Sequence, residues 1–205
     1  QFLENRVFKR ADHLVSLTQA SIKMLRKQYP DKPIDCIPCC VDLDRFQPKD
    51  RFQPNPKIDS PQHRLVSVGS LGLGYRADAV FEFANCYRQL HPHTHLDLIT
   101  RTAEATVRTA AEVAGFPLDA YSIRSVPHAE VASVVANSTV GICMIDPSES
   151  KIASCPTKLA EYLACGIPVV ANIPIGDVET TTVSTNVGVP LHLGVDSIAV
   201  AAGRR

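Results

Sequence analysis

Two loops of the sequence carry residue types that could bind a phosphorylated ligand. The first, VGSLGLGY, has glycines at Gly69, Gly72 and Gly74, which permit close backbone approach to a ligand. Their G-x-x-G-x-G spacing is not the dinucleotide fingerprint, and the loop has no Walker lysine. Arg76 follows at the start of an expected helix, where a phosphate would offset its unfavourable position against the helix dipole. A tight turn with a solvated arginine is the alternative interpretation.

The second loop opens the segment ASCPTKLAEYLACGIPVVAN. Pro156 suits the first turn of a helix, and Ser154 or Cys155 is the expected cap. The free N–H groups, assigned to residues 156 to 158, would point into a cleft at the positive end of the helix dipole. Lys158 adds positive charge. The segment therefore predicts an anion site at a helix N-terminus.

Glu161 lies about one and a half turns into the same helix. A carboxylate there can accept two hydrogen bonds from a vicinal diol while the N–H groups hold a phosphate. One helix end would then bind two parts of a sugar nucleotide. A glutamate on a solvated helix surface is the alternative interpretation.

These loops connect elements that alternate between apolar strands and amphipathic helices. Strands that are apolar on both faces and alternate with helices predict an α/β, Rossmann-like doubly wound parallel sheet. Ligands bind such sheets outside the C-terminal ends of the strands. The expected strands are 64–70, 95–100, 120–125, 139–145, 167–172 and 187–191, and the expected helices are 75–90, 102–115, 127–138, 156–166 and 195–203. Before them we expect a helix at 2–11, a strand at 13–17, a helix capped by Thr18 and ended by Pro30, and a strand at 34–38.

Composition narrows the possible functions. The formal net charge is zero, so charge gives no indication of nucleic-acid binding. No transmembrane segment and no signal peptide are evident. The chain opens directly on a helical pattern after Gln1, so we expect a piece of a longer protein. The seven cysteines favour reduced thiols in a cytoplasmic protein. The CIPCC cluster lacks the second pair of ligands of a zinc site. HPHTH is interpreted as a polar turn before a strand, and no metal is expected.

The ordered set ADHLVSLTQAS, IDCIPCCVDLDRFQP, VSVGSLG, STVGICMIDPS and SCPTKLAEYLACGIPVVAN resembles the C-terminal half of GT-B glycosyltransferases of family 4, the group 1 glycosyl transferases. IPCCVDLDRFQP is similar to the segment by which the chain enters that domain. PTKLAEYLACGIPVV is similar to the donor-binding helix and the strand after it. The resemblance covers most of the chain.

The resemblance implies a retaining transferase that uses a nucleotide-diphosphate sugar, UDP- or GDP-linked, with no cofactor and no bound metal. Residues 1–35 would end the N-terminal acceptor domain and connect it to a donor-binding domain at 36–205. The acceptor, a saccharide or a lipid-linked sugar, would bind the missing N-terminal domain, so catalytic residues are unknown and the chain alone is expected to be inactive. Polysaccharide or glycolipid synthesis in the cytoplasm, with a peripheral position at the inner membrane face as an option, fits this family. The expected donor-binding residues are Gly69, Ser70, Gly72, Arg76, Arg101, Ser154, Pro156, Thr157, Lys158 and Glu161.

The sequence departs from the family pattern at three places, one of which is LIT at residues 98–100, where glycines are common. Of the two glutamates that the family has in the donor loop, Glu161 matches the second, which by resemblance holds the ribose hydroxyls. The first falls on Ala153, for which Glu149 could substitute if the loop bends. The family's arginine and lysine for the diphosphate fall on Ser70 and Arg76.

Two other functions stay open at this point. A sugar-nucleotide epimerase with the same fold would need an acid/base histidine and carboxylate, for which His128, Asp146 and Glu149 are candidates. A non-catalytic Rossmann-like module would account for Ala153 and Ser70.

Arg101 could supply the second positive charge if the domain binds a diphosphate.

Overall fold

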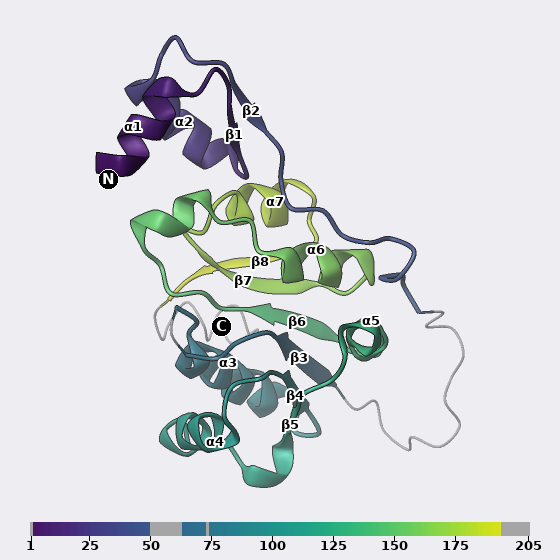
Figure 1. The fold of residues 1–205 in the computed structure, drawn as a ribbon. Coiled ribbons are helices and arrows are strands. Elements are labelled where there is room, and N and C mark those ends of the chain that lie inside the picture. The colour runs from purple at the N-terminus through teal and green to yellow at the C-terminus, as the bar shows by residue number, and fades with distance from the viewer. Residues whose placement is uncertain (1, 50–62, 73, 194–205) are drawn as a thin grey trace.

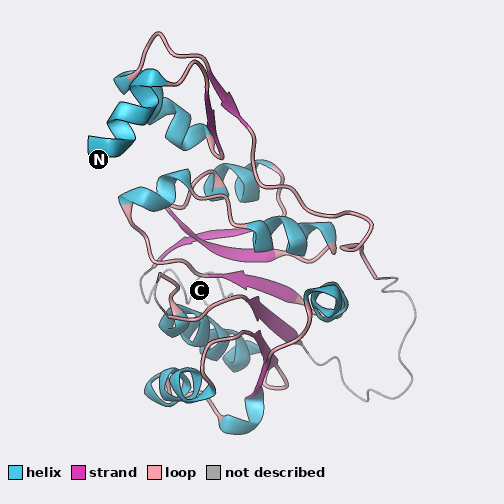
Figure 2. Ribbon diagram, in the orientation of Figure 1, coloured by secondary structure: helices cyan, strands magenta, loops and turns pink. Residues whose placement is uncertain are grey.

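The computed structural model describes residues 2–49, 63–72 and 74–193. The described chain forms a large parallel sheet covered by helices on both faces, and a smaller unit built from its N-terminal residues (Figures 1 and 2). The helix expected at 195–203 lies outside the described residues.

The large sheet has the strand order β5-β4-β3-β6-β7-β8, and its neighbouring strands pair in parallel. Its strands are β3 Arg64–Val68, β4 His95–Ile99, β5 Tyr121–Arg124, β6 Val140–Cys143, β7 Val169–Ile173 and β8 Gly188–His192. The chain runs outward from β3 to β5, returns to place β6 beside β3, and then runs outward to β8. This reversal confirms the predicted doubly wound, Rossmann-like sheet and puts its switch point between β3 and β6.

The helices that cover this sheet are α3 Ala77–Leu90, α4 Glu104–Val113, α5 His128–Ala136, α6 Thr157–Ala164 and α7 Val178–Ser184, with short 3-10 turns η1 Leu118–Ala120 and η2 Glu149–Ala153. Helix α7 was not predicted, because its sequence VETTTVS is rich in residues of weak helix propensity. Val178 and Thr182 are buried, so packing against the sheet stabilises a helix that local preference does not.

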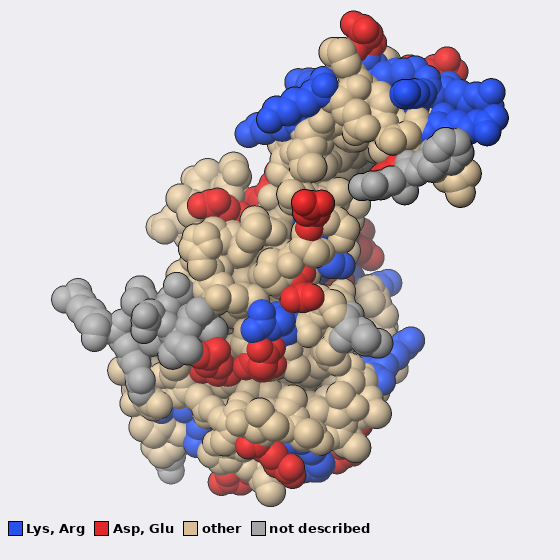
Figure 3. Space-filling model, turned by 90° about the vertical axis from the view of Figure 1, so that its left-hand side faces the viewer, with Lys and Arg blue, Asp and Glu red and all other residues tan. Residues whose placement is uncertain are grey.

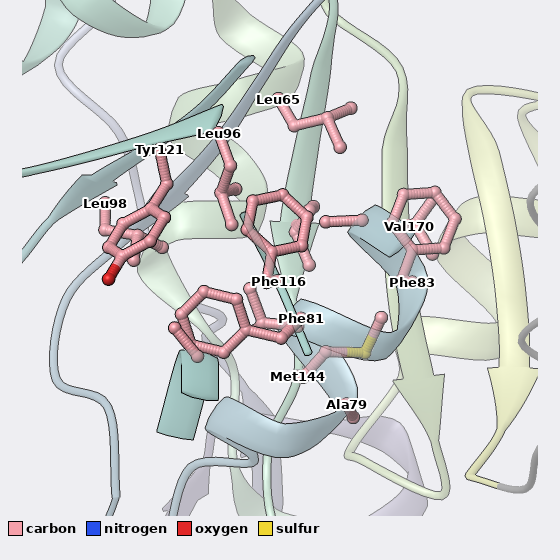
Figure 4. Close-up of a cluster of buried hydrophobic side chains, with 14 of the residues drawn as sticks. Leu65, Ala79, Phe81, Phe83, Leu96, Leu98, Phe116, Tyr121, Met144 and Val170 are labelled. Atoms are coloured by element: carbon pink, nitrogen blue, oxygen red, sulfur yellow. The ribbon is translucent and has the colours of Figure 1, made fainter. Parts of the chain in front are cut away.

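Two apolar cores lie on opposite faces of the sheet because side chains alternate along each strand. Leu65 of β3 belongs to the core under α3 and α4, and its neighbour Val66 belongs to the core under α5, α6 and α7. Figure 4 shows the first core, in which Phe81 and Phe116 lie beside Tyr121 with ring centroids 5.5 to 6.0 Å apart. Such rings bury large apolar areas and dominate core energetics.

Helix α6 lies close to the switch point because a glycine in β6 leaves room for its tyrosine. A Cβ added at Gly141 would lie 2.4 Å from Cδ2 of Tyr162, which is fully buried. The Tyr162 hydroxyl accepts a hydrogen bond from the backbone N–H of Val68 at 2.9 Å. One side chain thus fixes α6 against both central strands, and with it the position of the helix N-terminus.

The N-terminal unit has its own small core. It comprises α1 Phe2–Arg10, β1 Leu14–Ser16, α2 Gln19–Gln28 and β2 Ile34–Cys36, with β1 and β2 paired in parallel. Its core consists of Leu14, Ile22, Tyr29 and Ile34. Thr18 caps α2 as predicted, accepting a hydrogen bond from the Ser21 N–H at 3.1 Å. Lys and Arg side chains gather over this unit, at the top of Figure 3.

One carboxylate joins the N-terminal unit to the larger domain. Asp177, at the start of α7, accepts hydrogen bonds from the N–H groups of Gln19 at 2.6 Å and Ala20 at 2.9 Å. These are free amides of the first turn of α2, where negative charge is favourable. Thr18 adds a bond from its hydroxyl to the Ile152 carbonyl at 2.7 Å. The unit is therefore attached next to the loop that leads into α6.

Candidate functional site

A cleft lies at the C-terminal ends of the central strands, where the fold predicts a ligand site. Its first part is a cavity of about 200 Å³ formed by the loops that follow β3, β4 and β5. Three of the expected binding residues line it, namely Gly69, Ser70 and Arg101. His128, the first residue of α5, also lines this cavity.

A second cavity, of about 380 Å³, lies at the N-terminus of α6. It is lined by the expected residues Ser154, Pro156, Thr157 and Lys158, together with Ala153. The structure thus places seven of the expected residues in two cavities, three in one and four in the other.

The start of α6 differs from the prediction by one position. Pro156 is the cap residue, in extended conformation and with no side-chain cap hydrogen bond, so neither Ser154 nor Cys155 is the cap. Proline has no N–H group, and the Leu159 N–H donates to the Pro156 carbonyl at 3.0 Å, so the free amides are those of Thr157 and Lys158. The helix N-terminus lies within one residue of its predicted position, and the anion site there stays a prediction to which Pro156 cannot donate.

Lys158 connects the two cavities. A Cβ added at Gly69 would lie 3.2 Å from Lys158 Nζ, and that nitrogen lies 4.5 Å from the centroid of the Tyr75 ring. Gly69 has φ +104, a conformation that favours glycine. Its lack of a side chain also leaves room for the Lys158 ammonium group. Burial lowers the pKa of Lys158 from its usual value, while Cys143 and Glu161 act in the opposite direction. An anion bound beside the ammonium group would favour its charged form.

Glu161 points inward and not toward solvent. The residue is 8% exposed, which excludes the alternative of a solvated helix surface. Its Oε1 lies 3.7 Å from Nε2 of His128. A carboxylate can accept hydrogen bonds from hydroxyl groups, and this one lies next to a histidine that lines the first cavity.

In the described part of the chain, three of the ten expected residues do not line these two cavities: Glu161, which lies beside His128, and Gly72 and Arg76. Arg76 is the cap residue of α3 and forms a close ion pair with Asp78, with Nε–Oδ1 at 2.9 Å and a second contact of 2.6 Å. These hydrogen bonds raise the pKa of Arg76. Neither Arg76 nor Gly72 lines the two cavities, as far as the described residues show.

Sequence reasoning missed the contact between His128 and Arg45. One guanidinium nitrogen of Arg45 lies 2.7 Å from His128 Nδ1, although the two residues are 83 positions apart. Arg45 lies in an irregular segment after β2, where no periodicity indicated a role. The available signal was the DRF sequence at residues 44–46. Its phenylalanine, Phe46, is buried in the core under α5 and α6, and this places the preceding Arg45 near α5.

Two further searches of the described residues gave negative findings. No group of three or more His, Cys, Asp or Glu side chains could hold a metal ion within the described ranges. None of the helices described is long and apolar enough to cross a membrane.

Comparison with known proteins relates the fold to glycosyltransferases. A sucrose-phosphate synthase from Thermosynechococcus elongatus superposes with a TM-score of 0.70 at 17% identity, over 98% of this chain and 50% of that one. WaaG, a glycosyltransferase involved in lipopolysaccharide biosynthesis, gives 0.68 at 18% identity, over 94% and 54%. The pneumococcal O-GlcNAc transferase GtfA, solved with UDP and GlcNAc, gives 0.67 at 14% identity, over 98% and 39%.

These similarities establish the fold. The chain has the Rossmann-like fold of one domain of GT-B glycosyltransferases, as the resemblance implied. It spans about half the length of the sucrose-phosphate synthase and WaaG chains. No protein-family model matches the sequence, and no curated protein matches it.

Proposed function

We propose that the chain is the donor-binding half of a glycosyltransferase, which transfers a sugar from a nucleotide-diphosphate sugar to an acceptor. The observation that carries the proposal is the pairing of a helix N-terminus with an inward carboxylate on the same helix. Lys158 and the first amides of α6 lie at one cavity, and Glu161 faces His128 of the adjacent one. That arrangement fits a diphosphate next to a ribose.

The chemistry of binding follows from the positions of these groups. The helix amides and the Lys158 ammonium group would hold the diphosphate, because both are donors with positive charge. The Glu161 carboxylate would accept hydrogen bonds from the ribose diol. Gly69 would let the phosphates approach the β3–α3 loop, with Ser70 and Arg101 nearby in the same cavity. The base would then lie among the loops after β4 and β5.

The remaining parts of the proposal rest on the family resemblance. One part is retention of configuration. Another is the boundary between residues 1–35, as the end of an acceptor domain with the interdomain connection, and a donor domain at 36–205. The third is a saccharide or lipid-linked acceptor bound outside this chain. The small N-terminal unit, with its own core, supports that boundary. A role in polysaccharide or glycolipid synthesis in the cytoplasm is proposed on the same ground.

Calorimetric titration with UDP and GDP tests the donor site. We expect one of the two to bind, and Glu161→Ala to weaken binding by about ten- to a hundred-fold, since a hydrogen bond to a charged group contributes about 1.5–3 kcal/mol. Glu112→Ala, which removes an exposed carboxylate from α4, is the matched control and should leave the affinity unchanged. Failure of the unmodified chain to bind any nucleoside diphosphate would contradict the proposal.

A further inference from the structure

Four side chains form a continuous polar path from the segment after β2 to helix α6. Asp42 Oδ2 lies 3.8 Å from Nε of Arg45, and NH1 of Arg45 lies 2.7 Å from Nδ1 of His128. His128 Nε2 lies 3.7 Å from Oε1 of Glu161. The path connects a segment outside the two cavities to the carboxylate of Glu161, which lies 3.7 Å from His128, a lining residue of the first cavity.

The first contact determines where the imidazole of His128 carries its proton. A guanidinium group has only donors, so the ring nitrogen that faces Arg45 must present its lone pair. The ring proton is then on Nε2, the nitrogen that faces Glu161. If Nδ1 of His128 carried a proton, its N–H group would face an N–H group of Arg45 across 2.7 Å, which is unfavourable.

Local contacts order the segment that carries Arg45, while the side chains of Arg45 and His128 are 42% and 64% exposed. The Asp42 side chain accepts from the N–H groups of Asp44 at 3.0 Å and Arg45 at 3.3 Å, which closes a tight turn. The next residue, Phe46, is 2% exposed, and its ring meets the His128 ring edge to face at 6.0 Å. The imidazole is therefore held by an arginine at one nitrogen and by an aromatic ring at its side.

The second contact leaves the carboxylate of Glu161 available. A separation of 3.7 Å is longer than a hydrogen bond, so the neutral ring acts on the carboxylate through its Nε2–H dipole. The Nε2–H group thus orients the carboxylate without occupying its lone pairs. Within the described ranges neither Glu161 carboxylate oxygen has a hydrogen-bond partner, so both can accept hydrogen bonds from a ligand diol.

We propose that Arg45 is a positioning residue for ribose recognition: it fixes His128 as the Nε2–H tautomer, and that N–H group orients the Glu161 carboxylate toward the ribose hydroxyls. This inference rests on the proposed donor site. Its consequence is a preference for ribonucleotides over 2′-deoxyribonucleotides that depends on a residue outside the cavity.

The first test reads the tautomer directly. In the full 205-residue chain labelled with ¹⁵N, long-range ¹H–¹⁵N spectra should show His128 with a protonated Nε2 and an unprotonated Nδ1. The resonances are assigned by their loss in His128→Gln. In Arg45→Gln we expect the ring to lose this single tautomer. A proton on Nδ1 in the unmodified chain would overturn the proposal.

The second test measures the functional consequence. The affinity ratio between UDP and 2′-deoxy-UDP, or between GDP and 2′-deoxy-GDP if GDP binds better, should fall by about two- to tenfold in Arg45→Gln, the range expected for one ordinary hydrogen bond. Using a ratio cancels any loss of general attraction for phosphate. Lys49→Gln removes a cation from the same segment, where its amine contacts Asn137, and should leave the ratio unchanged.

A conservative substitution separates positioning from folding. The amide nitrogen of a glutamine can take the place of Nε2, so His128→Gln should keep most of the ribose preference and make it insensitive to Arg45→Gln. If the unmodified chain binds UDP or GDP but Arg45→Gln keeps the same ratio, this inference fails alone. If the unmodified chain binds neither nucleotide, the proposed function and this inference fail together.

Discussion

Lys158 is the residue whose chemistry is most constrained by its surroundings. Its ammonium group is packed between the Tyr75 ring and Gly69, and burial lowers its pKa. A buried charge with few partners lowers the free energy of unfolding of the ligand-free protein, and it raises the affinity for an anion. Stability and ligand affinity should therefore change in opposite directions when this charge is removed.

Lys158→Met should raise the free energy of unfolding at neutral pH and weaken binding of UDP or GDP by about ten- to a hundred-fold, as expected for loss of a charged hydrogen bond. The folded pKa lies below the ordinary value of 10.5, so the unfolded chain binds more protons between those two values. Wild-type stability from this group therefore rises with pH across that window. The advantage of the methionine variant should shrink as the pH approaches 10.5.

Urea unfolding of both proteins across the alkaline range measures that trend, and calorimetry measures the affinity. Lys27→Met, at an exposed position of α2, is the control and should show neither effect. An advantage that stays constant with pH would show that side-chain packing, and not the charge, is responsible.

At the scale of the element, α6 depends on the fit between a strand glycine and a helix tyrosine. Gly141→Ala should lower the free energy of unfolding by about 1–3 kcal/mol, because the added methyl group overpacks the core against Tyr162. The tyrosine is fully buried and bonded to the Val68 N–H, so it cannot move away. Chemical denaturation measures the loss.

A double-mutant cycle identifies the cause of that loss. In a Tyr162→Leu background the space beside β6 is larger, and Gly141→Ala should cost less than in the wild type. Equal costs in the two backgrounds would mean that the glycine is needed for strand conformation and not for helix approach.

The same elements show what the sequence could and could not predict. Apolar runs such as RLVSV at β3 and VGIC at β6 gave the strands of the sheet, because a covered parallel strand is apolar on both faces. Helix α7 was missed because its threonines disfavour a helix in isolation. The start of α6 was shifted because proline can occupy either the cap or the first turn.

The candidate site was predictable only where its residues follow one another in the chain. Ser154, Pro156, Thr157 and Lys158 line one cavity because they are consecutive or nearly so around a helix start. The contact of Arg45 with His128 depends on how the segment after β2 runs past α5. No local pattern encodes that path, so the tertiary fold was needed to find it.

At the scale of the whole molecule, Asp177 controls how firmly the N-terminal unit is attached. Asp177→Ala removes the two bonds to the Gln19 and Ala20 amides, which is equivalent to losing a helix cap of about 0.5–2 kcal/mol. Amide exchange in α2 should accelerate by about two- to thirtyfold, while exchange in β3 and β4 stays unchanged.

Hydrogen-exchange mass spectrometry resolves these regions. Glu179→Ala removes an exposed carboxylate two residues further along α7, and should leave exchange in α2 at its wild-type rate. Uniform acceleration throughout the chain after Asp177→Ala would indicate a loss of global stability, and would contradict a local role for this carboxylate.

The strand order also has a consequence for the time course of folding. Strands β3, β4 and β5 follow one another in the chain and pair as neighbours. After β5 the chain must cross back over β4 and β3 before β6 can pair with β3. Contacts between distant segments form slowly because ordering the intervening chain costs entropy before the contact is made. Because the cleft lies at that junction, we expect a partly folded chain to form the two halves of its sheet first and its ligand site last.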